Sequence, residues 1–274
     1  MEDRIKHIQD NLKEKYDYLI DSGYEVVALF LQGSQNYELD IYDDDYKSDI
    51  DAKAIVLPTM EDVILNKKPV SNTIVQENNE HIEVKDIRVM KEMFVRQNIS
   101  YIELLYTKFI IVNPKYKEYV IDLLDIRNEI ATINKNQFLR CIKGMSMEKY
   151  KALEHPYPTI IDKINKYGYD PKQLHHILRL YEFVERYLVN KEELSSCYVS
   201  NVKEELIRIK KGFYNLEEAR MLAKVYDTKT KELCNSYITE EDNINFDTID
   251  KLNSIITNIL RYSFYCQLKG SDVK

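Results

Sequence analysis

The spacing of apolar residues changes near residue 112, and this change limits the fold class more than any other feature of the chain. Before it, residues 25–32 form a continuous apolar run of strand length, which predicts a strand buried on both faces. After it, nearly every stretch repeats its apolar residues with a 3.6-residue period, which is typical of helices. We therefore predict a mixed α/β (α+β) unit with a small mixed sheet over residues 1–112, followed by an all-helical domain over residues 113–274.

The same patterns give the expected elements along the chain. A charged helix is expected over residues 2–22, before the apolar run. The remaining strand candidates are residues 49–58, 71–78, 80–88 and 108–113, and short helices are expected at 61–65, 88–97 and 100–106. The helices of the second half are expected at residues 115–127, 134–152, 171–189, 200–211, 216–236 and 247–267.

Composition narrows the classes of protein that this chain resembles. It is 44% hydrophobic and 31% charged, which is typical of a globular protein, and no apolar run is long enough to span a membrane. The four cysteines lie far apart, which disfavours disulfide scaffolds and zinc fingers and suits a reducing cytoplasm. The net charge of −7 argues against general electrostatic binding of nucleic acid. We expect a cytoplasmic protein with no membrane partner.

Two aspartates open the strand candidate at residues 49–58. Between Glu38 and Asp51 there are seven carboxylates and one basic residue, and Asp43, Asp44 and Asp45 are expected to be solvated in a loop. Asp49 and Asp51 differ from these because side chains at positions i and i+2 of a strand point to one face, about 6–7 Å apart. Two carboxylates held in this way suit divalent ions that also bind a phosphate.

A Gly-Ser turn precedes these acids. Gly33 follows the apolar run directly, and glycine permits a tight turn and close approach of a ligand to the backbone. Ser34 could cap a short helix whose free N–H groups attract phosphate oxygens. The turn lacks the Gly-Lys-Ser/Thr ending of a Walker loop, and the acidic run lacks the glycine and glutamate of an EF-hand.

The combination GSQNY…SDIDAK, residues 33–37 and 48–53, resembles the DNA polymerase β-like nucleotidyltransferase superfamily. Members of that superfamily carry a Gly-Ser turn, an Asp-x-Asp pair and a third carboxylate on a later strand. The resemblance implies a nucleotidyltransferase palm, with Gly33 and Ser34 holding the triphosphate. It also implies that Asp49 and Asp51 bind two Mg²⁺ ions, with Mn²⁺ as the alternative metal.

The third carboxylate is expected within EHIEVKDIR, residues 80–88. Glu83 fits best because it shares one strand face with His81 and Lys85, and Asp86 is the competitor. Most members have Asp at this place, so Glu83 would be a departure. A separate acid, Glu103, lies in an apolar helix, where it either holds a basic residue such as Arg88 or is simply exposed.

The helical half adds a second resemblance. The segment YGYDPKQLHHILRLYEFVERYL, residues 167–188, begins with Asp170 as a helix cap and Pro171 at the first helical position. This segment and NISYIELLY, residues 98–106, resemble predicted bacterial and phage nucleotidyltransferases described as RNA-repair-pathway polymerase β-family proteins. Pro171 and Ile99 depart from that subgroup, which tends to have Thr and Pro at these places.

By this resemblance three residues of the segment, Lys172, His176 and Arg179, face the catalytic cleft and bind the nucleotide. They lie on one stripe of the expected helix, and the alternative is a solvated face. Phe183 in the same stripe favours a partly covered cleft over open water. His176 could instead be a structural histidine, and His175 is expected at the surface.

The expected activity is metal-dependent transfer of a nucleoside monophosphate from an NTP, such as ATP, to an acceptor hydroxyl, with release of pyrophosphate. An RNA end, a protein hydroxyl and a small molecule all remain open as the acceptor. The alternative is a non-catalytic nucleotide sensor or regulator of the same fold, as in a toxin–antitoxin pair. A plain helical interaction protein with an incidental acidic loop is a third class, which predicts no stabilisation by metal.

Overall fold

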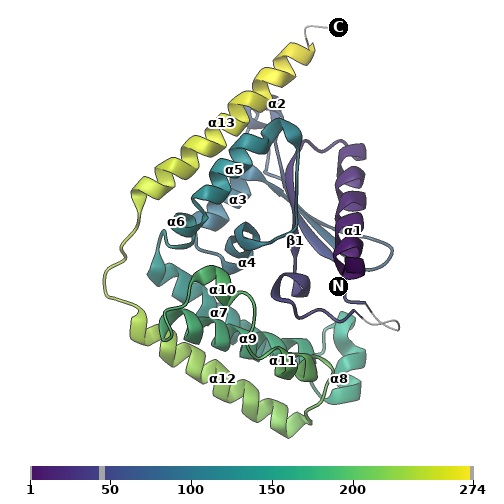
Figure 1. Cartoon of the computed structure of the whole chain (residues 1–274), viewed down its shortest axis with the longest axis vertical. Helices are drawn as coiled ribbons and strands as arrows, with labels where there is room; N and C mark the ends of the chain where they lie inside the picture. The colour runs from purple at the N-terminus through teal and green to yellow at the C-terminus, as the bar shows by residue number, and fades with distance from the viewer. Residues whose placement is uncertain (1, 43–46, 272–274) are drawn as a thin grey trace. The chain divides into compact units, whose positions relative to one another are not determined.

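A five-stranded mixed sheet organises the first part of the chain. The computed structural model describes residues 2–42 and 47–271 (Figure 1). The strands are β1 (Val26–Gln32), β2 (Asp51–Val56), β3 (Ser71–Val75), β4 (His81–Asp86) and β5 (Ile110–Val112), in the order β3-β4-β2-β1-β5. Strands β2 and β4 run parallel, whereas the other neighbours are antiparallel. The prediction of a mixed sheet followed by many helices is confirmed.

The two faces of the sheet differ in chemistry. One face carries Leu29 and Leu31 of β1 with Ala52 and Ala54 of β2, all fully buried in the hydrophobic core. Helix α1 (Glu2–Asp21) adds Ile8, Leu12 and Leu19 to this core, so α1 covers the apolar face. Because side chains alternate along a strand, the intervening residues must point to the opposite face. In Figure 1 α1 lies on one side of the sheet, and α3 and α5 lie on the other.

Short helices and a long terminal helix complete the unit that contains the sheet. A capping box of Thr59 and Asp62 starts α2 (Met60–Ile64), and side chains of Asp86 and Asn98 cap α3 (Ile87–Val95) and α4 (Ile99–Ile102). The unit also contains residues 34–36 of the 3₁₀ helix η1 (Ser34–Tyr37). Its other elements are η2 (Glu103–Tyr106), η3 (Pro114–Tyr116), α5 (Lys117–Asp125), α6 (Arg127–Ala131) and α13 (Phe246–Ser271).

The second unit is helical and is built around α9 (Pro171–Leu188). As predicted, Asp170 caps this helix and Pro171 occupies its first turn. Helix α9 packs against α7 (Lys135–Ala152), α10 (Leu194–Cys197), α11 (Lys203–Lys210) and α12 (Leu216–Tyr237). The unit also contains η4 (Pro158–Ile160) and α8 (Ile161–Tyr167).

One residue of α9 corrects an interpretation of the sequence. Phe183 is 2% exposed and packs against Phe138 and Tyr198 inside the helical unit. Its burial therefore has an ordinary packing reason, and Phe183 does not mark a partly covered cleft.

The two compact units are not continuous in sequence. The first comprises residues 1–36, 42–134 and 244–274, and the second comprises residues 37–41 and 135–243. The segment Tyr37–Ile41, which lies between β1 and β2 in sequence, thus belongs to the helical unit. The packing units differ from the domain limits of 1–112 and 113–274, which stay a prediction.

None of the helices between residues 2 and 271 that the structure describes combines the length and apolar character needed to cross a bilayer.

Candidate functional site

A row of polar side chains lies on the sheet face opposite α1. Strand pairing sets Gln32 opposite Asp51 and Lys53 opposite Glu83. The residues between them, Leu31, Ala52 and Ile82, belong to the apolar face and are fully buried. The alternation therefore places polar residues of β1, β2 and β4 on one face. These residues are Gln32, Asp51, Lys53, His81, Glu83 and Lys85.

Asp49 lies two residues before Asp51, in the segment that leads into β2 (Asp51–Val56). Ile50 is 1% exposed and lies in the hydrophobic core, whereas Asp49 is exposed and Asp51 is half-buried. Because Ile50 points to the apolar face, the side chains on either side of it point away from the core. The pairing of Asp49 and Asp51 as ligands of one site stays a prediction.

The glycine turn lies next to these acids. Gly33 directly follows Gln32, the β1 residue that pairs with Asp51, and it has a φ of +94°. Two residues further on, the Gln35 side chain donates hydrogen bonds to the carbonyl oxygens of Ser48 (3.2 Å) and Asp49 (2.5 Å). The turn and the acidic segment are thus joined directly, and neither is remote from the other.

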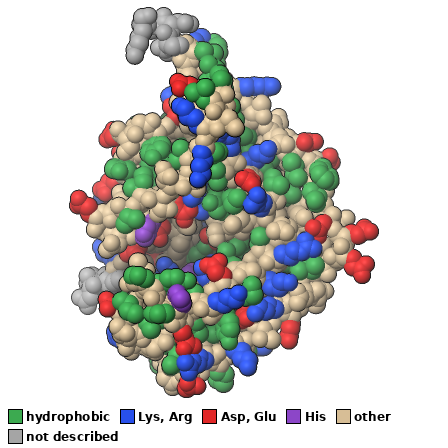
Figure 2. Space-filling view, turned by 180° about the vertical axis from the view of Figure 1, so that it is seen from behind, with side chains coloured by type: hydrophobic (Ala, Val, Ile, Leu, Met, Phe, Trp, Pro, Cys, Tyr) green, Lys and Arg blue, Asp and Glu red, His purple; other side chains and the backbone are tan. Residues whose placement is uncertain are grey.

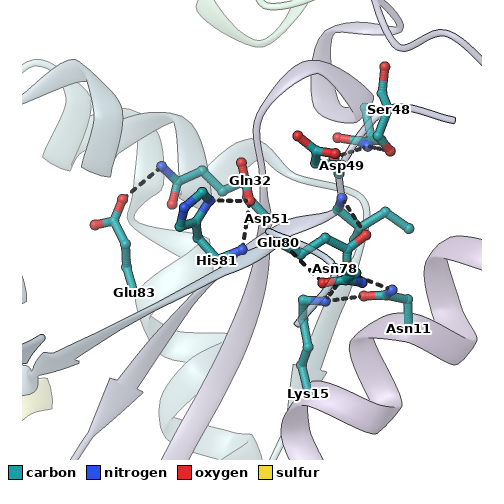
Figure 3. A network of polar contacts seen from close by, with 12 residues as sticks. Asn11, Lys15, Gln32, Ser48, Asp49, Asp51, Asn78, Glu80, His81 and Glu83 are labelled. Atoms are coloured by element: carbon teal, nitrogen blue, oxygen red, sulfur yellow. Dashed lines mark hydrogen bonds and ion pairs between the residues drawn. The ribbon is translucent and has the colours of Figure 1, made fainter. Parts of the chain in front are cut away.

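A buried ion pair holds the backbone between the two aspartates. Lys15 of α1 is 2% exposed and pairs with Glu80, which is 7% exposed. The other oxygen of Glu80 accepts a hydrogen bond of 2.9 Å from the backbone N–H of Ile50, and Asn11 donates to the same carboxylate. Figure 3 shows this group joining α1 to the segment that carries the aspartates.

The environment of Glu80 favours its charged form. Burial raises the pKa of this carboxyl, but the contacts with Lys15, the Ile50 N–H and Asn11 outweigh burial and place the pKa below its ordinary value. Glu80 is therefore an ionised anchor for the start of β2.

Asp51 and His81 are in direct contact across β2 and β4. Asp51 Oδ1 accepts a hydrogen bond of 2.9 Å from the His81 backbone N–H and lies 3.2 Å from His81 Nδ1 (Figure 3). Both side chains are open to solvent, with 32% of Asp51 and 45% of His81 exposed. These two groups could therefore be reached by a ligand from outside.

Glu83, the expected third carboxylate, makes three contacts with neighbouring side chains. Its carboxylate lies 3.2 Å from Lys53 Nζ and 3.7 Å from Lys85 Nζ, and it accepts a hydrogen bond of 3.1 Å from Gln32 Nε2. Burial raises the pKa of Glu83, but these partners outweigh burial and keep the pKa below its ordinary value. The role of Glu83 as a metal ligand stays a prediction.

Lys53 is the buried centre of this group. It is 1% exposed and its ammonium lies 3.8 Å from the centre of the Tyr101 ring. Burial lowers the pKa of Lys53, although the charges of Glu83 and Glu103 oppose that shift. Glu103 is only 8% exposed, so it is not the plain exposed acid of the alternative, and its pairing with a basic residue such as Arg88 stays a prediction.

Asp86, the competitor for the third carboxylate, has a structural role. It accepts a hydrogen bond of 2.8 Å from the backbone N–H of Arg88 in the first turn of α3, and its carboxylate binds the Arg88 side chain at 2.6 and 2.9 Å. Asp86 is 1% exposed, and by alternation it lies on the opposite face of β4 from Glu83. Asp86 is thus the cap of α3, and the choice between Glu83 and Asp86 as the third carboxylate stays a prediction.

The three residues predicted on the helical half lie together in the second unit. Lys172 is exposed in the first turn of α9, His176 and Arg179 are half-buried, and the Arg179 guanidinium lies 3.8 Å from the centre of the Tyr37 ring. Burial, together with His175 and nearby cations, lowers the pKa of His176 well below its ordinary value. Their role in nucleotide binding stays a prediction.

The neighbouring histidine differs from its prediction. His175 is 4% exposed, and its Nδ1 lies 3.0 Å from the carbonyl oxygen of Leu206 on α11. Burial lowers the pKa of His175 to about 4. His175, which was expected at the surface, is therefore the structural histidine of this helix.

The polar face carries oxygen donors of the kind that a divalent metal binds. Among residues 2–42 and 47–271, no group of three His, Cys, Asp or Glu side chains is arranged to hold an ion; the acids Asp43, Asp44 and Asp45 lie outside these residues. Gln32 Oε1, however, is buried and accepts no hydrogen bond from any described residue. Mg²⁺ usually binds one or two carboxylates together with water and substrate phosphates, so Asp49 and Asp51 fit this kind of site.

Four residues of this site were not predicted from the sequence. Lys15, Lys53, Gln32 and Gln35 contribute contacts that pattern rules do not reveal, since lysine and glutamine are usually exposed. One signal was present: Lys15 lies in register with the apolar residues Ile8, Leu12 and Leu19 of α1. A charge on the buried stripe of a helix indicates a buried partner.

Comparison with known proteins adds little. No protein-family model and no curated protein matches the chain. A solved structure, described as a nucleotidyltransferase-like protein from Exiguobacterium sibiricum 255-15, is similar over 85% of this chain and 75% of its own length. The identity is 9% and the TM-score is 0.28, which is too low to support a shared function.

Proposed function

We propose that the protein is a metal-dependent nucleotidyltransferase that moves a nucleoside monophosphate from an NTP to an acceptor hydroxyl and releases pyrophosphate. One observation carries the proposal: two aspartates flank a buried isoleucine at the start of β2, beside the glycine turn that ends β1. Paired carboxylates next to a turn that permits close backbone approach suit a triphosphate with its divalent ion.

In this proposal Asp49 and Asp51 hold Mg²⁺, or Mn²⁺ as the alternative, and Gly33 and Ser34 hold the triphosphate. A bound divalent ion would lower the pKa of the attacking hydroxyl and neutralise the leaving oxygens. Lys172, His176 and Arg179 are proposed to bind the nucleotide, with ATP as the first NTP to try.

The protein's own part is mainly positioning. Gln35 binds the carbonyl oxygens of Ser48 and Asp49, and Glu80 binds the N–H of Ile50, so the peptide groups on both sides of the first aspartate are held before substrate binds. Such preorganisation lowers the free-energy cost of ordering the site when a ligand binds.

The proposal predicts that Asp49→Asn and Asp51→Asn each lower metal-dependent pyrophosphate release by at least about 100-fold, which is the usual cost of removing one preorganised group that stabilises charge in a transition state. Purified variants are assayed with each NTP, Mg²⁺ or Mn²⁺ and a cell extract as the acceptor source. Asp10→Asn, which removes an exposed acid of α1, is the matched control and should retain full activity.

Thermal unfolding without metal should be close to wild type in all three variants, because both site aspartates are at least partly exposed. Turnover that survives in both site variants would contradict the assignment.

A non-catalytic nucleotide sensor is the second candidate. It is favoured by one observation, namely that the described residues offer no ready group of three metal-binding side chains. This candidate predicts binding of NTP in titration calorimetry, with or without Mg²⁺, and no release of pyrophosphate.

The acceptor is open to experiment. On the face shown in Figure 2, Lys and Arg side chains lie among Asp and Glu side chains, which does not favour nucleic acid over a small molecule or a protein hydroxyl. Incubation with NTPs labelled at the α-phosphate and a whole-cell extract would show which molecule acquires the label. RNase and protease treatment of the labelled product would then separate the three classes.

A further inference from the structure

Three neighbouring strands bring three different donor groups to one level of the polar face. Gln32 of β1 pairs with Asp51 of β2, and Asp51 binds the backbone N–H of His81 on β4. In Figure 3 the side chains of Gln32, Asp51 and His81 gather at this place, and Glu83 lies apart from Asp51. The strand register places Glu83 opposite Lys53, one same-face position further along the sheet.

We infer that His81, and not Glu83, supplies the β4 ligand of the metal site, through Nδ1 and next to Asp51 Oδ1, with Gln32 Oε1 beside them. The inference rests on the proposed function and deepens it, because it makes the site one of mixed oxygen and nitrogen donors. Such a site prefers a divalent first-row transition ion, here Mn²⁺ as the probe, over Mg²⁺.

The spacing of the donors agrees with shared ligation. Two donor atoms each about 2.1 Å from an octahedral ion and at right angles to each other lie about 3.0 Å apart. His81 Nδ1 and Asp51 Oδ1 are 3.2 Å apart, so a small adjustment would let both bind one ion. The 45% exposure of His81 leaves its ring free to make that adjustment.

The contacts of Glu83 make it a poor ligand. Both of its oxygens are engaged, one with Gln32 and the other with Lys53 and Lys85. A metal ion drawn to Glu83 would have to compete with two ammonium groups, and its arrival would leave the buried Lys53 without its nearest anion. Glu83 is thus the counter-ion of Lys53, and it orients the Gln32 amide so that Oε1 is free to accept.

The donor types decide the metal. Mg²⁺ demands oxygen ligands and keeps several waters, whereas imidazole is a common ligand of transition ions and binds them more strongly than it binds Mg²⁺. A histidine at the place where a carboxylate would suit Mg²⁺ therefore shifts the preference of the site.

The test is electron paramagnetic resonance of Mn²⁺ bound to the full chain, with and without a non-hydrolysable ATP analogue. We expect electron spin echo modulation from a directly bound ¹⁴N nucleus, and its loss when histidine is labelled with ¹⁵N. We also expect His81→Asp to abolish the nitrogen signal. In this variant the ratio of the Mg²⁺ to the Mn²⁺ dissociation constant should fall roughly tenfold or more. Glu83→Gln is the matched variant on the same strand, and it should keep the nitrogen signal.

The outcomes separate the possibilities. A bound Mn²⁺ without a nitrogen signal in the wild-type chain overturns the inference, as does a nitrogen signal that persists in His81→Asp or disappears in a folded Glu83→Gln. The wild-type spectra suffice if a variant does not fold. None of these readouts depends on turnover. If pyrophosphate is not released but the nitrogen signal is intact, the result contradicts the proposed enzyme and still supports His81 as a metal ligand.

Discussion

At the scale of single residues, two buried lysines explain how a charged site is held on a sheet. Lys15 and Lys53 lie on opposite faces, each with a glutamate of the β3–β4 region as its partner. Buried ion pairs of this kind add little net stability, but loss of one partner leaves an uncompensated charge in a nonpolar setting. The glutamates Glu80 and Glu83 are thus more than surface acids.

The Lys15–Glu80 pair gives a prediction about stability. Glu80→Gln should lower the free energy of unfolding at pH 7 by about 3 kcal/mol, because the Lys15 ammonium would stay buried without its anion. The double variant Lys15→Met/Glu80→Gln should regain a large part of that loss. Urea unfolding measures both, and Lys13→Met, which removes one half of an exposed pair on the same helix, should change stability by less than about 1 kcal/mol.

The pH dependence of the same pair has a definite sign. The pKa of Glu80 in the folded protein lies below its unfolded value of 4.5, so its contribution is present above pH 4.5 and is lost as the pH falls through the folded pKa. The difference in stability between wild type and Glu80→Gln should therefore shrink in acid. A difference that stays constant down to pH 3 would contradict the role of this carboxylate.

At the scale of elements, the junction of β1 with η1 depends on one backbone conformation. Gly33 has a φ of +94°, which a side chain rarely adopts, although an added Cβ would meet its nearest described neighbour, Gln35 Oε1, only at 3.8 Å. The requirement for glycine is thus conformational and does not come from crowding.

Gly33→Ala should accordingly lower the free energy of unfolding by about 1–2 kcal/mol and weaken metal–nucleotide binding, because Gln35 and the acidic segment would shift with the turn. Gly144 is the matched control: it lies inside α7 with no atom of the described residues within 4 Å of an added Cβ. Gly144→Ala should raise stability by about 0.5–1 kcal/mol through helix propensity. Equal effects of the two substitutions on unfolding would contradict this account of the turn.

The elements were largely predictable because their apolar spacing is strong. The helix expected at residues 2–22, the strand at 25–32 and the cap at Asp170 all correspond to the structure. The short helices α6, α8 and α10 were not expected, since one or two turns give too little periodicity to read.

The site was predictable only in part. The prediction that Asp49 pairs with Asp51 rests on alternation within one segment, which a sequence displays directly. The choice among His81, Glu83 and Asp86 as the β4 ligand depends on the register between β2 and β4. This register pairs residues about thirty positions apart and cannot be predicted from local sequence patterns. Burial of Lys53 and of His175 likewise depends on tertiary partners that residue type does not reveal.

At the scale of the whole molecule, the chain leaves the sheet unit after residue 36 and returns to it at residue 42, between β1 and β2. The segment Tyr37–Ile41 belongs to the helical unit, although it directly follows the glycine turn and precedes the acidic segment. Leu39 of this segment is fully buried, and its carbonyl oxygen accepts a hydrogen bond from Lys210 on α11. The segment between the glycine turn and the acidic segment is therefore anchored within the helical unit.

The most direct measurement of the central claim is a crystal structure of the chain with Mn²⁺ and a non-hydrolysable ATP analogue, with data collected for the anomalous signal of manganese. The account predicts an anomalous peak about 2.1–2.3 Å from a carboxylate oxygen of Asp51, with Asp49 and the triphosphate in contact with the same ion or its neighbour. Well-ordered nucleotide with no manganese beside Asp49 and Asp51, or manganese bound elsewhere on the chain, would contradict it.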